Sequence, residues 1–294
     1  MKIPSRYTVH IFALLTIVMW SAGNVLTRVA VRYYTPDALA FLRYAVAAAA
    51  LAVCARMMKM RLPAPRDVPV FILGGVLGFA LYAFAFNAGL RTITASEFSF
   101  ILSAVPIFTA ILARVILKEK IGLLGWACVA GGFTGVGIIA VSGGGMAFRA
   151  GALWACFTAF LGASYYVFQR KLFGRYSPLE ITTYCSVAGA AMLAVFAPNS
   201  LPQLIHAPAY QIVVLVILGV FPAAAAYLSW SYALSAAEKT SQVTNYMFFT
   251  PILTTLLGAA MISELPPAST YAGGALVLAC VLLVNMRGRF VKAK

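Results

Sequence analysis

Apolar residues form ten long runs along the chain, separated by short polar gaps. The runs are continuously apolar rather than alternating, which favours helices over the strands of a barrel. A helix needs about 20 apolar residues to cross a bilayer, and each run supplies close to that number. The sequence therefore predicts ten transmembrane helices, at residues 9–29, 36–55, 69–90, 96–117, 122–142, 150–169, 178–197, 210–233, 241–262 and 268–286.

The gaps between the runs are short and contain turn-forming residues. Prolines and glycines in them predict tight connections rather than extra domains. The residues in question are Pro63, Pro65, Gly143–Gly145, Pro198 and Pro202.

Composition agrees with a protein that faces lipid. Hydrophobic residues make up 63% of the chain, charged residues 10%, and the mean hydropathy is +0.93. Soluble domains carry roughly a quarter charged residues, so this class is excluded. The net charge of +15 does not indicate nucleic acid, because the basic residues lie in the gaps between runs rather than along a soluble face.

The distribution of Lys and Arg predicts the orientation. Counted over alternate gaps and termini, 17 lie on the side that holds both chain ends and four on the other, while Arg43 lies inside the second run. Positive charge accumulates on the cytoplasmic side of a membrane protein. We therefore expect a multi-pass protein with both termini in the cytoplasm.

The chain contains an internal repeat. Shifting the sequence by 145 residues superposes Tyr82–Glu119 on Tyr227–Glu264 without a gap, with eight identities in 38 positions. The identities include a proline and, 13 residues later, a glutamate. The repeats are expected at residues 1–146 and 147–294, each with five spans, so the second would cross the bilayer in the opposite sense. Inverted repeats around a central cavity are typical of alternating-access transporters, although duplication without functional symmetry is the alternative.

These features resemble a known transporter group. Ten spans in two five-helix halves, with VPIFTAILARVILKEK in span 4 and TPILTTLLGAAMISE in span 9, are similar to the drug/metabolite transporter superfamily. Within it the EamA-type exporters are nearest, among them amino-acid exporters of the YddG type. The resemblance implies a bacterial inner-membrane protein with a cavity lined mainly by spans 1, 3, 4, 6, 8 and 9. It does not fix the substrate.

Polar and aromatic side chains on the predicted inner faces suggest a binding site. Polar groups in lipid turn towards the protein interior, and aromatic rings beside neutral hydrogen-bonding groups suit an amphipathic solute. Packing between helices, or anchoring at the membrane interface, is the alternative reading for each residue. The predicted substrate-binding residues are Trp20, Asn24, Tyr82, Phe86, Ser99, Tyr165, Tyr227, Trp230, Thr244, Asn245 and Phe248.

Two prolines are candidates for hinges in the predicted cavity. Pro106 in span 4 and Pro251 in span 9 occupy equivalent positions in the repeats, and each removes a backbone donor and bends its helix. Interrupted helices at matching places in two halves indicate a substrate site. Bends that serve only packing are the alternative.

The distribution of charge narrows the substrate. Every Asp and Glu lies at or beyond a span end, so no side chain is evident for a proton relay or for binding a cationic drug. Among the Lys and Arg residues only Arg43 lies well inside a predicted span. We favour a structural role for it over contact with a substrate carboxylate. Neutral or zwitterionic solutes remain, with amino acids, aromatic ones included, as the best fit. Transport is expected to need no proton coupling, and export of other drugs or metabolites is the alternative.

No enzyme or cofactor signature accompanies these features. The five cysteines lie singly within apolar runs, and no metal-binding, phosphate-binding or nucleophile motif is present. We therefore expect neither a metal nor a cofactor; a membrane enzyme is the less favoured alternative. The expected partners are a small-molecule substrate, amino acids in the first place, and the lipid bilayer; nucleic acid is not expected. The sequence does not predict the oligomeric state, and a monomer is compatible with it.

Overall fold

The protein is all-helical and has the segments of a multi-pass membrane protein. The computed structural model describes residues 6–116, 122–141, 150–237, 243 and 245–290. Among them, eight helical segments are long and apolar enough to cross a membrane: Val9–Ala30, Pro36–Met57, Pro65–Thr92, Ala95–Leu112, Leu123–Ala140, Ala150–Gln169, Pro178–Ile205 and Ala209–Ala236. Two shorter apolar helices, Tyr246–Ile262 and Ala268–Leu283, follow them in the chain.

Several of these segments consist of more than one helical element. The elements of the first half are α1 (Arg6–Ala30), α2 (Pro36–Met57), η1 (Pro65–Asp67), α3 (Val68–Gly75), η2 (Val76–Ala80), α4 (Leu81–Thr92), α5 (Ala95–Leu102), α6 (Val105–Ile116) and α7 (Leu123–Ala140). Those of the second half are α8 (Ala150–Leu172), α9 (Pro178–Leu193), η3 (Ala194–Phe196), α10 (Ala197–Ile205), α11 (Ala209–Leu218), η4 (Gly219–Ala225), α12 (Ala226–Ala236), η5 (Asn245–Phe248), α14 (Phe249–Ile262) and α15 (Ala268–Phe290).

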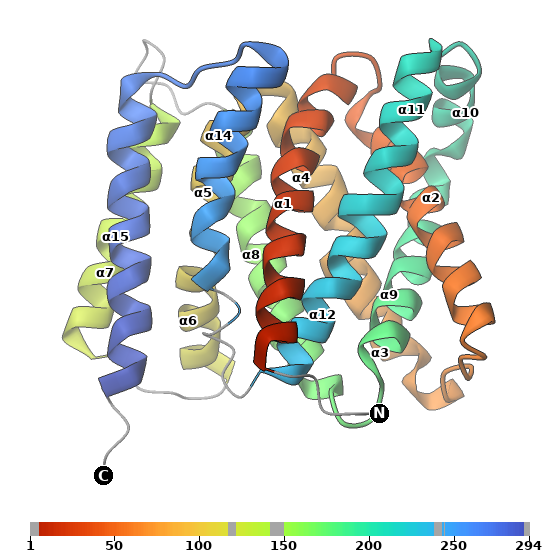
Figure 1. The fold of residues 1–294 in the computed structure, drawn as a ribbon, viewed down its shortest axis with the longest axis horizontal. Coiled ribbons are helices and arrows are strands. Elements are labelled where there is room, and N and C mark those ends of the chain that lie inside the picture. Colours follow the sequence, from red (N-terminus) through yellow and green to blue (C-terminus); the bar gives the residue numbers. More distant parts are fainter. Residues whose placement is uncertain (1–5, 117–121, 142–149, 238–242, 244, 291–294) are drawn as a thin grey trace.

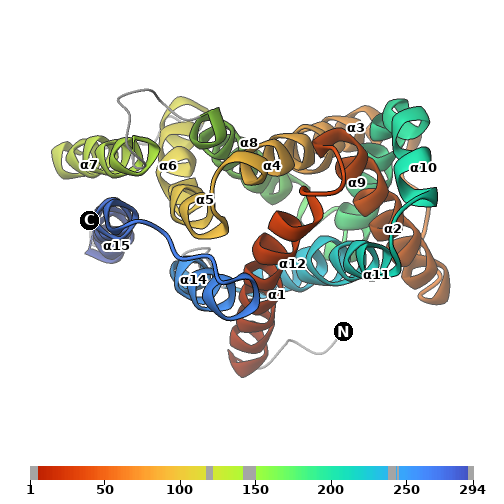
Figure 2. The same cartoon turned by 90° about the horizontal axis from the view of Figure 1, so that it is seen from above.

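The helices stand roughly parallel and form two rows. In the view from above, one row runs from α7 through α6, α8 and α4 to α3, and the other from α15 through α14, α1 and α12 to α11 (Figure 2). Helix α1 begins and α15 ends at the same end of the bundle, the lower end in Figure 1. Helices α7 and α15 pack closely at one edge, because Gly135 and Gly273 let their backbones approach: a Cβ on either would lie 2.6 Å from the other's carbonyl oxygen.

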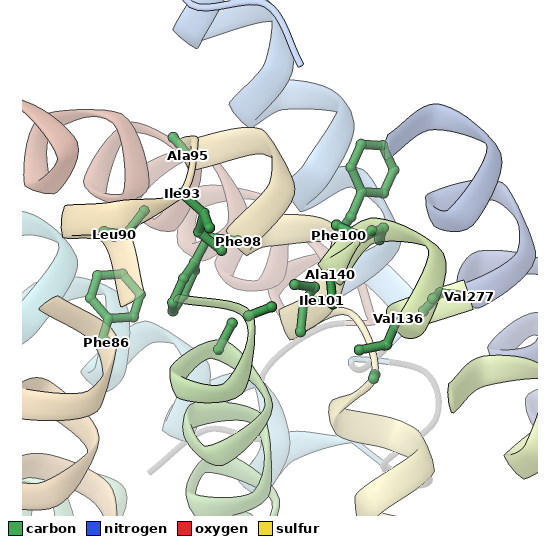
Figure 3. Close-up of a cluster of buried hydrophobic side chains, with 14 of the residues drawn as sticks. Phe86, Leu90, Ile93, Ala95, Phe98, Phe100, Ile101, Val136, Ala140 and Val277 are labelled. Atoms are coloured by element: carbon green, nitrogen blue, oxygen red, sulfur yellow. The ribbon is translucent and has the colours of Figure 1, made fainter. Parts of the chain in front are cut away.

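Two apolar clusters hold the halves of the bundle together. One joins α4, α5, α7, α8 and α15 around fully buried side chains such as Phe98 and Ile101 (Figure 3). The other joins α2, α3, α9 and α12 and includes Tyr44 and Phe79, whose rings meet edge to face at 5.5 Å. Phe86 of the first cluster and Tyr227 of the second both line the cavity described below.

Non-α geometry occurs at equivalent places in the two halves. Elements η2 and η4 are π-helices, and a shift of 145 residues carries Val76–Ala80 onto the last five residues of η4. The helical segment that contains Pro106 is interrupted between α5 and α6, and α14, which contains Pro251, directly follows the 3-10 turn η5. π-Helices are frequent at functional sites, and here each directly precedes a helix that reaches the cavity.

The prediction that Pro198 and Pro202 lie in a connection is wrong. After the single 3-10 turn η3, α10 continues the seventh apolar segment to Ile205, and both prolines belong to it. Pro198 lies in the first turn of α10, where the backbone N–H has no partner within the helix, so its absence costs no hydrogen bond. Pro202 lies inside the helix and removes one backbone hydrogen bond. Gly143–Gly145 lie outside the described residues.

Candidate functional site

A partly open cavity lies between the two rows of helices. Its aromatic lining consists of Trp20, Tyr82, Phe86, Tyr166 and Tyr227. The polar lining residues are Asn24, Arg43, Ser99, Ser103 and Thr250. The small and aliphatic ones are Gly23, Leu102, Val105, Gly162, Pro222 and Met247.

The aromatic rings form a connected wall. The Trp20 ring lies 5.7 Å from that of Tyr227, edge to face, and 5.0 Å from that of Trp230. Trp230 is 1% exposed and also contacts Tyr166, with ring centroids 5.9 Å apart. Paired rings at these distances stabilise each other beyond their buried area. The wall is therefore a preformed surface on which the apolar part of a solute can pack.

Neutral groups tie α1 to α14 beside this wall. The side-chain amide of Asn24 donates to Thr254 Oγ1 at 3.2 Å, and the Ser21 hydroxyl donates to the Thr250 carbonyl at 3.3 Å. Ser99 Oγ is buried and has no hydrogen-bond partner among the described residues. An unsatisfied buried hydroxyl in a cavity wall is available to a solute.

Charge is scarce at the cavity. Arg43 is the charged side chain among its described lining residues, which include no Asp, Glu or His. The lining can therefore orient a polar group by hydrogen bonds and one cation, but it offers no carboxylate to a positive group.

The structure brings six of the predicted substrate-binding residues together around the cavity. They are Trp20, Asn24, Tyr82, Phe86, Ser99 and Tyr227. Their helices come from both halves of the chain, so only the tertiary fold unites them.

The other predicted site residues lie behind the lining or are not described. Trp230 supports Trp20 from behind, and Tyr165 packs against Phe79 with ring centroids 5.5 Å apart. Phe248 is half-buried against the apolar cluster of α4, α5 and α7. Asn245 belongs to η5, where only its backbone is described, and Thr244 lies outside the described residues.

The two predicted hinge prolines follow helix irregularities. Pro106 is the second residue of α6, directly after the interruption at Ser103 and Ala104. Pro251 is buried near the start of α14. Their role in gating stays a prediction.

Several lining residues were not in the predicted site. Tyr166, rather than Tyr165, faces the cavity, a difference of about 100° around the helix. Pro222 lies in η4, and Gly23 packs against it so closely that a Cβ there would lie 2.8 Å from the proline ring. A proline in the apolar run GVFPAAAA was the available sequence signal for Pro222.

Polar contacts hold α1 to the ninth apolar segment at both ends. At the end away from the termini, Arg28 Nε lies 3.0 Å from Glu264 Oε1, and the guanidinium also donates to the carbonyls of Leu90 and Arg91 at 2.8 Å each. Near the start of α1, the Tyr246 hydroxyl and His10 Nδ1 form a hydrogen bond of 2.8 Å.

The local backbone explains why Glu264 reaches Arg28. Ser263 adopts a left-handed conformation (φ 53°) that ends α14, and the Glu264 amide then donates to the Gly258 carbonyl at 3.1 Å. Glu264 Oε2 accepts from the amide of Ala95, the first residue of α5, at 3.2 Å. One carboxylate thus caps a helix start and binds an arginine that caps the end of α4.

Comparison with known proteins identifies the family. The sequence matches the EamA-like transporter family twice, over residues 8–141 and 149–286. The chain belongs to the EamA-like transporter family. The family resemblance seen in the sequence is thereby confirmed, and the two matches divide the transporter into two copies of one unit.

Named relatives of the transporter include a "probable terminal-alkyne amino-acid exporter" of Streptantibioticus cattleyicolor. It is 30% identical over 276 residues, which cover 93% of this chain and 92% of the relative. The uncharacterized transporter YdfC of Bacillus subtilis is 29% identical and covers 93% of this chain and 89% of its own. A solved crystal structure matches with a TM-score of 0.66 at 20% identity, covering 98% of this chain and 100% of its own, which shows a common fold.

Proposed function

We propose that this transporter exports neutral or zwitterionic small metabolites, with amino acids, aromatic ones included, as the first candidates. The observation that carries the proposal is the central cavity, which combines an aromatic wall with neutral hydrogen-bonding groups. Rings pack the apolar part of an amphipathic solute, while hydroxyl and amide groups orient its polar end. The Streptantibioticus relative, named a probable terminal-alkyne amino-acid exporter, supports this substrate class.

The proposed architecture is ten crossings in two five-helix halves, residues 1–146 and 147–294, inserted with opposite sense. The paired family matches and the π-helices at equivalent positions support it. The 17-to-4 bias of basic residues supports a bacterial inner-membrane location with both termini cytoplasmic.

Alternating access would open the cavity at one end at a time. The two ties of α1, Arg28–Glu264 at one end and His10–Tyr246 at the other, are separate contacts that can break independently. A transporter needs two conformations whose free energies differ by only a few kcal/mol. A few polar contacts at each end contribute free energies of that order, because one hydrogen bond contributes about 1 kcal/mol. Pro106 and Pro251, next to helix irregularities, are the proposed hinges.

Transport is proposed to be independent of protons. Coupling through a side chain needs a group that titrates inside the bilayer, and the described cavity lining contains no carboxylate and no histidine. The solute then moves down its own concentration gradient.

The test is counterflow in liposomes that contain the purified transporter and unlabelled phenylalanine. Labelled phenylalanine outside should enter at the same rate with and without an imposed pH gradient. Absence of counterflow for phenylalanine, leucine and tryptophan alike would refute amino-acid transport. Uptake that needs the gradient and collapses with a protonophore would refute the uncoupled mechanism. Protein-free liposomes are the control.

A further inference from the structure

Arg43 lies deep in a membrane-spanning helix and points inward. It is the eighth of the 22 residues of α2, about 10 Å along the axis from the helix start. The side chain is buried within the protein, with 6% of its surface exposed. Its Nη1 donates to Thr27 Oγ1 at 3.2 Å, and the guanidinium carbon lies 5.4 Å from the centre of the Phe86 ring. The guanidinium therefore faces the cavity between α1, α2 and α4.

The hydrogen bonds of this guanidinium are incomplete. Arg43 Nε has no partner in the described part of the chain, although it is fully shielded from solvent. A guanidinium has five N–H donors, and the bond to Thr27 uses only one of them. A buried cation with unused donors is unfavourable by several kcal/mol unless an anion or acceptor completes it.

The described carboxylates that could neutralise Arg43 are all engaged elsewhere. Their contacts are Asp37 with Asn199, Asp67 with Arg175, Glu97 with the Thr94 amide, Glu180 with the Ser177 amide, and Glu264 with Arg28. Within the described lining no carboxylate faces the cavity. The partner that fits Arg43 is an anion brought in by the solute.

The shape of the surroundings indicates which anion. Arg43 shares the cavity with Trp20 and Tyr82, so the anion must be attached to an apolar body that packs on these rings. A single guanidinium can bind one carboxylate by two parallel hydrogen bonds and balance its charge. A phosphate monoester carries about −1.5 to −2 at neutral pH, so one guanidinium would leave part of that charge uncompensated. An ammonium group on the solute would meet aromatic ring faces and hydroxyl groups in the described lining, but no negatively charged side chain.

We propose that Arg43 binds the solute's carboxylate and that the site selects amphipathic carboxylates. The α-ammonium group of an amino acid is then not required for binding. This inference rests on the proposed transport function and modifies its substrate class: amino acids are recognised through their acid group, and anionic acids without an amine also bind. Compounds that keep the ring and the carboxylate but lack the amine are accepted. Compounds that keep the amine but lack the acid are rejected.

The test compares three phenyl compounds by direct binding, independently of flux. The purified protein in detergent is titrated with phenylalanine, 3-phenylpropionate and phenylalaninamide. Intrinsic tryptophan fluorescence reports binding, because Trp20, one of the four tryptophans, lines the cavity. We expect the two acids to bind within about tenfold of each other and the amide to bind roughly 10- to 100-fold more weakly than phenylalanine, the range for a charge-assisted hydrogen bond. The inference is overturned if phenylalaninamide binds as tightly as phenylalanine or more tightly. It is also overturned if phenylalanine or 3-phenylpropionate fails to bind.

Variants then assign the selectivity to Arg43. Arg43→Gln should weaken both acids roughly 10- to 100-fold and remove the preference over the amide, while Arg43→Lys should keep part of it. The matched control is Arg56→Gln, which removes the same charge from an exposed position of the same helix and should leave binding unchanged. If Arg43→Gln keeps the preference for acids, the anchor is elsewhere.

The two proposals fail in different ways. Acid-selective binding together with absent counterflow would refute transport and leave the Arg43 site supported. Phenylalanine counterflow in a protein that binds the amide as well as the acid would refute the Arg43 site and leave transport supported.

Discussion

The contact between Arg28 and Glu264 gives a prediction about the end of the bundle away from the termini. The two side chains are 18% and 14% exposed, so the pair lies between a surface ion pair and a buried one. Exposed pairs contribute about 0–1 kcal/mol, and a hydrogen bond to a charged group about 1.5–3 kcal/mol. Glu264→Gln keeps the shape but removes the charge, so we expect the tie to weaken by about 1.5–2 kcal/mol. That corresponds to a roughly 10- to 30-fold increase in opening.

Hydrogen exchange of the Ala95 amide reports this opening most cleanly in Arg28→Gln, which breaks the same tie but leaves the amide's acceptor in place. The amide donates to Glu264 Oε2, so its exchange should accelerate by the same roughly 10- to 30-fold when the tie weakens. A double-mutant cycle with Arg28→Gln, Glu264→Gln and the double variant isolates the pair's own contribution.

The control is Glu180→Gln, which removes a carboxylate that caps the start of its own helix, α9, through the Ser177 amide. It should leave exchange at Ala95 unchanged. A coupling free energy below about 0.5 kcal/mol in the cycle would show that the pair does not hold this end closed, and our reasoning about α1 would be wrong.

Three further outcomes are expected. Tyr82→Ala should weaken phenylalanine binding by about 1–3 kcal/mol, roughly 5- to 150-fold, in the fluorescence titration, whereas Trp126→Ala on the exposed surface should not. Gly135→Val should lower the free energy of unfolding by about 1–3 kcal/mol in a thermal unfolding experiment, because a Cβ there would lie 2.6 Å from the Gly273 carbonyl oxygen. Gly137→Val is the control and should leave the free energy of unfolding unchanged, because nothing lies within 4 Å of a Cβ at that position. A cytoplasmic reporter fused after Lys294 should be active and a periplasmic one silent, and the reverse would overturn the orientation.

The apolar runs predicted the long apolar helices well, although the structure describes eight helices long enough to cross a membrane and two shorter ones rather than ten full spans. The second was predicted at residues 36–55 and is helical from Pro36 to Met57. The agreement has a physical reason: lipid sets the length of a helix and requires its backbone to be paired internally. The π-helices and the interruption before Pro106 were not predicted in detail, because apolar side chains look alike in α, π and 3-10 geometry.

The cavity could be predicted only in part. Tyr82 and Tyr227 were recognised because the internal repeat relates them, and both line the cavity. Arg43 was assigned a structural role, since long basic side chains often reach the interface from a helix. Its orientation depends on Thr27 and Phe86, which belong to other helices, and a linear pattern carries no information about such neighbours.

The two π-helices also bear on how the cavity wall is built. The same irregularity occurs in both copies of the family unit, at positions 145 residues apart. Each lies directly before the helix that supplies a tyrosine to the cavity, Tyr82 in α4 and Tyr227 in α12. A π-turn bonds residue i to residue i+5 and so changes the direction in which the following side chains point. The two tyrosines are therefore aimed at the cavity by the same local backbone geometry.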